Sequence, residues 1–164
     1  MERLRLWMLL VVIVAVATLI FATTDALPAS VGSHFGPGGA ADGFMTRDFY
    51  RWYMSAFASL LPLSIYAAIG WLPTRIPRLT NLPDKDHWFA PARREVTLAT
   101  LAGFGTAIGI WASLFIGGVH LLLLQANALS PPRLAEGPFY GLLGAFMIGM
   151  IVLILAMRAR FRRR

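Results

Sequence analysis

The sequence predicts an all-α polytopic membrane protein with four transmembrane helices and an ordered loop outside the membrane. Of its 164 residues, 57% are hydrophobic and only 14% are charged, whereas about a quarter of the residues in a soluble domain are charged. Four apolar runs occur; three are close to the ~20 residues that cross a hydrocarbon core, and the third in chain order is longer. No segment between the runs is long enough for a soluble domain, so we expect residues 1–164 to form a single membrane domain.

The first helix is expected over residues 4–23, because Arg3 and Arg5 precede an apolar run. A basic start followed by an apolar run also describes a cleavable signal peptide. The run is long for a signal peptide and further spans follow it, which favours a retained helix. Cleavage of residues 1–22 is the alternative.

Residues 24–49 are expected to form the ordered outward loop. The segment is rich in Gly and Pro, which excludes a long helix. Asp42-Gly43 is typical of a tight turn, so a short hairpin or a compact ordered loop is possible.

The second helix is expected over residues 50–72. Aromatic residues mark its two ends and indicate the two membrane interfaces. They are Phe49, Tyr50, Trp52, Tyr53 and Trp71. A basic, proline-rich loop follows over residues 73–91. Pro62 lies in the middle of the helix and frees one backbone carbonyl, because proline has no N–H to donate.

The third and fourth helices are expected over residues 92–126 and 138–157. Each carries a small residue at every fourth position, a pattern that lets helices approach closely in lipid. In the third helix these are Gly105, Gly109, Ser113 and Gly117, and in the fourth they are Gly141, Ala145 and Gly149. We expect the two ridges to face each other. They either pack within one chain or form a seam to a second copy or another membrane protein.

The distribution of basic residues predicts the orientation. Of the 15 Lys and Arg residues, 12 lie in the first five residues, within residues 73–95 or after the fourth helix, and three lie in the intervening segments. Because basic residues favour the cytoplasmic side, we expect both termini in the cytoplasm and a bacterial inner membrane location. The formal charge of +7 indicates anionic lipid headgroups as a partner and not nucleic acid.

His120 is the one ionisable side chain inside an expected span, and such a residue is a candidate functional site. Asn127 lies seven residues later, on the same helix face. Together they predict a polar site for a proton or small ligand. The alternative is a structural histidine that bonds a backbone carbonyl, such as the one freed by Pro62.

Two further groups are candidates for ligand or partner binding. His34 and Asp42 lie in the outward loop, but the spacing of its acidic and histidine residues matches no metal motif, and the chain has no Cys. We therefore expect no metal and no cofactor. On the other side, Trp88, Arg93 and Arg94 predict either contact with the lipid interface or docking of a partner protein.

The outward loop contains Leu27-Pro28, Val31, His34-Phe35 and Asp42-Gly43-Phe44. This pattern resembles an uncharacterised family of bacterial membrane proteins, and the same segment is found in SdpI-type immunity proteins. The resemblance implies a folded cap over the outer ends of the helices. It also implies a role in immunity to a toxin or in holding a regulator at the membrane.

The sequence shows no nucleophile–base constellation and no phosphate loop, so we do not expect an enzyme. The leading expectation is a non-catalytic binding or accessory protein that contacts another membrane protein or an outward peptide. The alternative is a small transporter or ligand-sensing protein with its polar site at His120.

Overall fold

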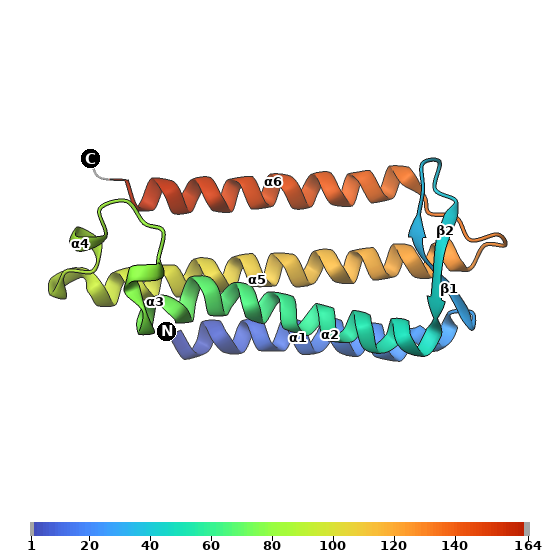
Figure 1. The fold of residues 1–164 in the computed structure, drawn as a ribbon, viewed down its shortest axis with the longest axis horizontal. Coiled ribbons are helices and arrows are strands. Elements are labelled where there is room, and N and C mark those ends of the chain that lie inside the picture. The colour runs from blue at the N-terminus through green and yellow to red at the C-terminus, as the bar shows by residue number, and fades with distance from the viewer. Residues whose placement is uncertain (1, 163–164) are drawn as a thin grey trace.

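A computed structural model describes residues 2–162 and confirms the all-α fold class (Figure 1). Four segments are helical and are long and apolar enough to cross a membrane. Within them lie α1 (Glu2–Thr23), α2 (Arg47–Tyr66), α5 (Pro91–Asn127) and α6 (Glu136–Arg160). Each long helix extends beyond its expected range at one or both ends. At a rise of 1.5 Å per residue, the 37 residues of α5 measure about 55 Å, well beyond a ~30 Å hydrocarbon core.

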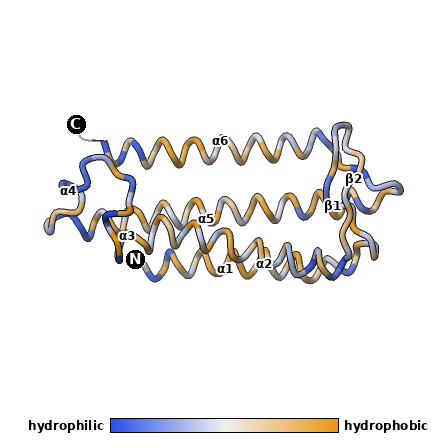
Figure 2. Tube along the Cα trace, viewed as in Figure 1, coloured by the Kyte–Doolittle hydropathy of each residue, from blue (hydrophilic) through white to orange (hydrophobic). Residues whose placement is uncertain are grey.

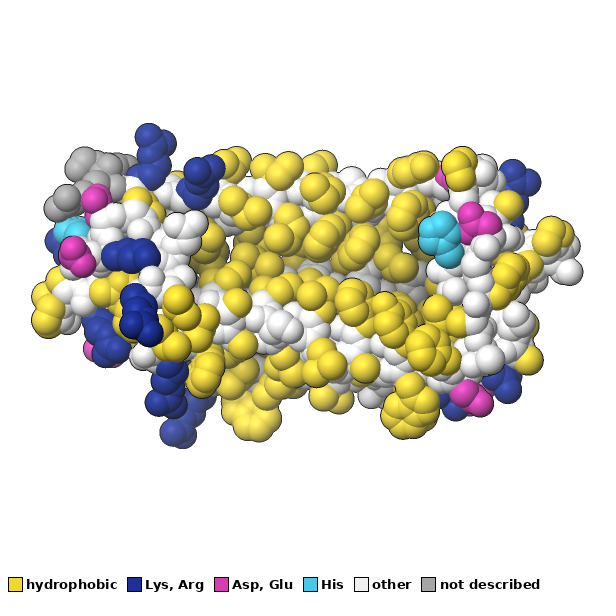
Figure 3. All heavy atoms as spheres, viewed as in Figure 1, with side chains coloured by type: hydrophobic (Ala, Val, Ile, Leu, Met, Phe, Trp, Pro, Cys, Tyr) yellow, Lys and Arg dark blue, Asp and Glu magenta, His cyan; other side chains and the backbone are white. Residues whose placement is uncertain are grey.

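The elements that join the helices lie at the two ends of the bundle (Figure 1). One end holds both termini together with α3 (Leu72–Arg75) and α4 (Lys85–Trp88). The other end holds the two strands. Hydrophobic residues predominate along the middle of the helices and polar residues at the ends (Figure 2), as expected for segments that cross a bilayer. Basic side chains occur at both ends and gather most densely at the end with the termini (Figure 3).

The helices α1, α2 and α5 pack together as a three-helix core. The ridge glycines of α5, Gly105, Gly109 and Gly117, face α1 and the second membrane segment and not α6, so the expectation that the ridges of α5 and α6 face each other is wrong. A Cβ atom added at Gly109 would lie 3.0 Å from Leu9 and 3.2 Å from the carbonyl oxygen of Pro62, and one added at Gly117 would lie 3.4 Å from Val16. Two helices therefore occupy the face of α5 on which we expected α6.

The second membrane segment runs beyond α2 without a break. After Tyr66 it continues as a π-helical turn over Ala67–Trp71 and then as α3. Within this turn Gly70 passes close to α5, because a Cβ added there would lie 3.0 Å from the Cα of Ala102. The π turn thus coincides with a close backbone approach between these two segments.

The helix α6 packs mainly against α5. The indole N–H of Trp111 donates to the carbonyl oxygen of Phe146 at 3.0 Å, and Phe115 stacks on Phe146 with ring centroids 4.3 Å apart. Gly149 gives Trp111 its space, since an added Cβ would lie 2.4 Å from the indole nitrogen. No residue of α6 is buried, so this helix forms an outer layer on the core.

The outward loop contains an antiparallel hairpin of β1 (Ser30–Phe35) and β2 (Ala41–Thr46). Its turn uses Gly38 and Gly39, which have φ values of 81° and 77°, a region that glycine enters at low cost. Thr46 caps α2 by accepting a hydrogen bond from the Phe49 N–H at 3.3 Å. The loop therefore ends before Arg47, three residues earlier than expected, because this cap starts the helix.

Candidate functional site

His120 forms a buried polar cluster with Tyr50 and Thr23, which come from α2 and α1. The Tyr50 hydroxyl lies 2.7 Å from Nδ1 of His120, and the Thr23 hydroxyl lies 2.7 Å from Nε2. His120 is 0% exposed and Tyr50 is 1% exposed. The polar cluster thus joins all three core helices through one imidazole.

The donors and acceptors in the polar cluster can be assigned by counting the hydrogens that each group can donate. The Thr23 hydroxyl donates its single hydrogen to the Leu19 carbonyl oxygen at 2.6 Å, so toward His120 it acts as an acceptor. Nε2 of His120 then carries the hydrogen and Nδ1 accepts from Tyr50, which is one tautomer of a neutral imidazole. The hydrogen bonds therefore run in one direction, from Tyr50 to His120, from His120 to Thr23 and from Thr23 to the Leu19 carbonyl. Each of the three side chains has its hydrogen-bond partners.

The structure differs from both expectations for His120, the polar site shared with Asn127 and the bond to a backbone carbonyl. It bonds two hydroxyl groups and not the carbonyl freed by Pro62. Asn127 forms a separate group of hydrogen bonds and is not linked to His120 by a hydrogen bond.

Asn127 fastens the hairpin to the end of α5. Its side-chain oxygen accepts from the Gly32 N–H at 2.7 Å. Its NH₂ group donates to the carbonyl oxygens of Gly32 at 2.9 Å and Leu123 at 3.0 Å. Gly32 permits this approach, because an added Cβ would lie 3.3 Å from the Asn127 oxygen and 3.0 Å from Ala41. The amide therefore pairs with both backbone groups of one hairpin residue.

His34 and Asp42 form an ion pair across the hairpin on its exposed surface, where Figure 3 shows a histidine beside an acidic side chain. Gly43 lies opposite His34, and a Cβ added to it would lie 2.9 Å from the His34 Cβ. At the turn, the Arg133 guanidinium donates to the Gly38 carbonyl oxygen at 3.0 Å. The hairpin is thereby tied both to α5 and to the connection between α5 and α6. Among residues 2–162, no three His, Asp or Glu side chains come together as a metal site.

At the end with the termini, Trp88 is buried among side chains of the protein. Its ring meets Phe161 edge-on, with centroids 5.3 Å apart. These two residues form a buried cluster with Leu82 and Leu101. This contact joins α4 to the residue that follows α6 and leaves Trp88 little surface for a partner.

The two arginines near Trp88 lie in different surroundings. Arg93 lines a cavity of about 220 Å³ together with Arg160 and Phe161. Arg94 donates to the carbonyl oxygen of Thr74 at 3.4 Å, which fixes the start of α5 to the end of α3.

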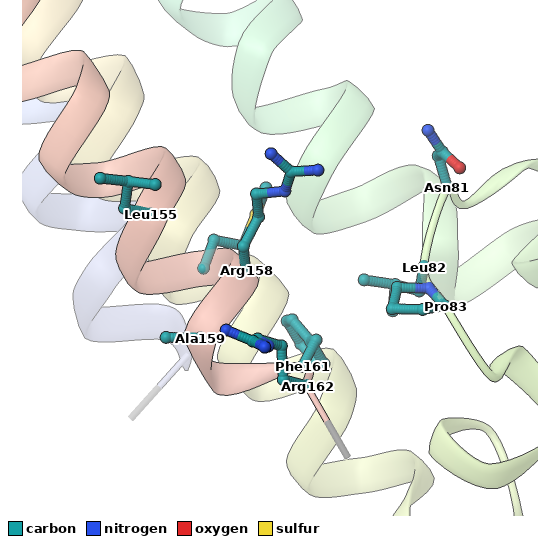
Figure 4. Close-up of a pocket in the computed structure, with 9 residues that line it drawn as sticks. Asn81, Leu82, Pro83, Leu155, Arg158, Ala159, Phe161 and Arg162 are labelled. Atoms are coloured by element: carbon teal, nitrogen blue, oxygen red, sulfur yellow. The ribbon is translucent and has the colours of Figure 1, made fainter. Parts of the chain in front are cut away.

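A larger cavity of about 860 Å³ opens on the other side of Phe161, between the end of α6 and the connection from α3 to α4 (Figure 4). We call it the arginine pocket. It is lined by Asn81, Leu82, Pro83, Leu155, Met157, Arg158, Ala159, Phe161 and Arg162. Sequence reasoning did not bring these residues together, because the cavity forms only where two distant segments meet.

Tyr50 and Thr23 were also missed as partners of His120. Tyr50 is one of four aromatic residues at the start of α2 that indicated a membrane interface, and Thr23 is the last residue of α1. The available signal was that all three residues lie near the same end of their spans. Comparisons with family models, curated proteins and solved structures found no match to this chain. The family resemblance therefore stays a prediction.

Proposed function

We propose that this protein is a non-catalytic binding or accessory protein of a bacterial inner membrane, and that it binds another transmembrane helix through α6. The observation that carries this proposal is the open glycine face of α6. Cβ atoms added at Gly137, Gly141 and Gly144 would meet nothing within 4 Å. The three glycines recur at intervals of four and three residues and so share one side of the helix.

The contrast with α5 supports this reading. The glycines at 105, 109 and 117 are covered by α1 and α2, as expected for small residues that let helices approach. The glycines of α6 provide the same kind of surface without a covering helix. The same side of α6 continues through Ile148 and Val152, which are also exposed, so the open glycines belong to a longer apolar surface that a second helix can cover.

The polar cluster gives less support to the alternative of a transporter or ligand-sensing site. Both ring nitrogens of His120 are already bonded to hydroxyl groups, and the side chain is fully buried. A ligand would have to displace one of these bonds. We therefore assign His120 a structural role.

The experiment is to compare association in native membranes after replacement of the open glycines. The chain is extracted gently and purified as the wild type and as a Gly141→Leu/Gly144→Leu double variant. The mass of the resulting particles and the identity of any companion protein are then measured. We expect the wild type to carry a second copy or another membrane protein, and the double variant to lose it.

Ala156→Leu is the matched control, because it also adds bulk to an exposed position on α6. It should leave the association intact. Either of two results would overturn the proposal. One is a wild-type chain that is monomeric in nanodiscs and in native membranes. The other is a companion protein that both variants keep equally.

A further inference from the structure

We propose that the arginine pocket binds the phosphate of one anionic phospholipid, with an acyl chain lying along the last turns of α6. The pocket brings the guanidinium groups of Arg158 and Arg162 together with an apolar wall. Its volume of about 860 Å³ is within the range of small-molecule sites.

The charge of the pocket selects an anion. None of the nine lining residues is acidic, and Arg158 and Arg162 are the two charged ones. Within residues 2–162, neither side chain has a hydrogen bond or ion pair to another residue. Two unpaired guanidinium groups at one opening favour a phosphate, which they can bind through paired N–H donors.

The position of the pocket selects a lipid over a soluble anion. The apolar run of α6 ends at Met157, and Arg158 begins the basic tail, so the pocket lies at the level where the hydrocarbon core meets the headgroups. Leu155, one turn before Arg158, is 57% exposed and faces the same cavity. A phosphate bound by the arginines would therefore have its glycerol and acyl chains next to this leucine.

The opposite wall is supplied by the connection between α3 and α4. Figure 4 shows Arg158 extending from α6 into the space that separates it from Asn81, Leu82 and Pro83. Leu82 and Phe161 are both buried in the cluster around Trp88. This cluster holds the two walls at a fixed separation, so the pocket is built by the fold and does not depend on the tail alone.

The test counts lipids on the intact chain by native mass spectrometry. The protein is placed in nanodiscs of phosphatidylcholine that contain increasing fractions of phosphatidylglycerol. We expect one phosphatidylglycerol to be retained by the wild type. The double variant Arg158→Gln/Arg162→Gln should bind it about 30-fold more weakly, if each arginine contributes ~1 kcal/mol.

Arg93→Gln/Arg160→Gln is the matched control, since it removes the same charge from the neighbouring cavity. It should keep the retained lipid. If both double variants lost bound phosphatidylglycerol equally, the lipid would be attracted diffusely to the basic end of the bundle, and the proposal would be overturned.

A second arm distinguishes a lipid from a free anion. Inorganic phosphate and glycerol phosphate are added in excess to the same nanodiscs. Phosphatidylglycerol should stay bound, because the apolar wall contributes only to the lipid. Displacement by either soluble anion would show a simple phosphate site and would contradict the proposal.

Discussion

His120 shows how an ionisable side chain is accommodated inside a membrane-spanning helix. Its two nitrogens bond Tyr50 and Thr23 at 2.7 Å each, and the three residues belong to three different helices. In a bilayer, hydrogen bonds between helices contribute about 0.6–1.7 kcal/mol each. The polar cluster thus stabilises the arrangement of the core, and its removal should be measurable as stability.

We predict that His120→Leu lowers the free energy of unfolding by about 1–3 kcal/mol, because two such hydrogen bonds are lost. The measurement is reversible unfolding in mixed micelles. The matched control is His34→Leu, which removes an exposed ion pair and should cost less than ~1 kcal/mol. Equal stability of the His120→Leu variant and the wild type would show that the polar cluster does not hold the core together.

At the scale of elements, one side chain of α5 fastens the hairpin to that helix, beside the backbone hydrogen bonds from Ala41 to Pro132 and from Leu134 to Gly39. Asn127 satisfies both the N–H and the C=O of Gly32, and the amide group is buried. Buried backbone groups that lose their partners cost about 1–3 kcal/mol. The hairpin also has ties at its turn, through Arg133 and Glu136 to Gly38, but these bonds are exposed and contribute less.

We predict that Asn127→Ala loosens the hairpin without unfolding the helices. Backbone amide exchange in residues 30–46 should become about 10-fold faster or more, which corresponds to a loss of at least ~1.4 kcal/mol in local stability. Gln125→Ala is the matched control, because it shortens an exposed amide side chain near the same end of α5; its effect should be smaller. Unchanged exchange in Asn127→Ala would mean that the turn contacts alone hold the hairpin.

The small-residue patterns of α5 and α6 show that the role of such a pattern depends on which helices pack against it. On α5 the pattern is covered by α1 and α2, whereas on α6 Gly149 receives Trp111 and Gly141 is open. The sequence pattern is the same in both helices. Its role differs because α5 is central and α6 packs on one side of it.

At the scale of the whole molecule, the two ends of the bundle carry different structural elements. One end carries both termini and the basic connections, and the other carries the hairpin (Figure 1). Within residues 2–162, this arrangement requires an even number of crossings, which the four apolar helices supply. We expect the end with the termini to face the cytoplasm, because it carries the excess of basic residues.

We predict that a cysteine at Ser33 is labelled by a membrane-impermeant maleimide in intact cells, whereas a cysteine at Asn81 is labelled only after permeabilisation. The native chain has no Cys, so each single substitution reports one position. Both residues should be labelled in permeabilised cells, which controls for reactivity. The opposite pattern would reverse the orientation.

The sequence by itself determined the fold class, the four spans and the possibility of a hairpin in the outward loop. Apolar length and turn residues are local properties, and the bilayer translates them directly into helices and connections. The ends of the helices were less well predicted, since a cap such as Thr46 acts within one turn and can start a helix before the apolar run begins.

Only the tertiary structure decided which surfaces meet. It placed Tyr50 and Thr23 on His120, separated Asn127 from that cluster, buried Trp88 against Phe161 and put Leu82 and Arg158 on the two walls of one pocket. These contacts join residues that are far apart in the chain. The helices α1, α5 and α6 are apolar on several sides, because lipid accepts any apolar face. Periodicity therefore could not indicate which face of α5 binds α1 and α2, which face binds α6, or which glycines stay open.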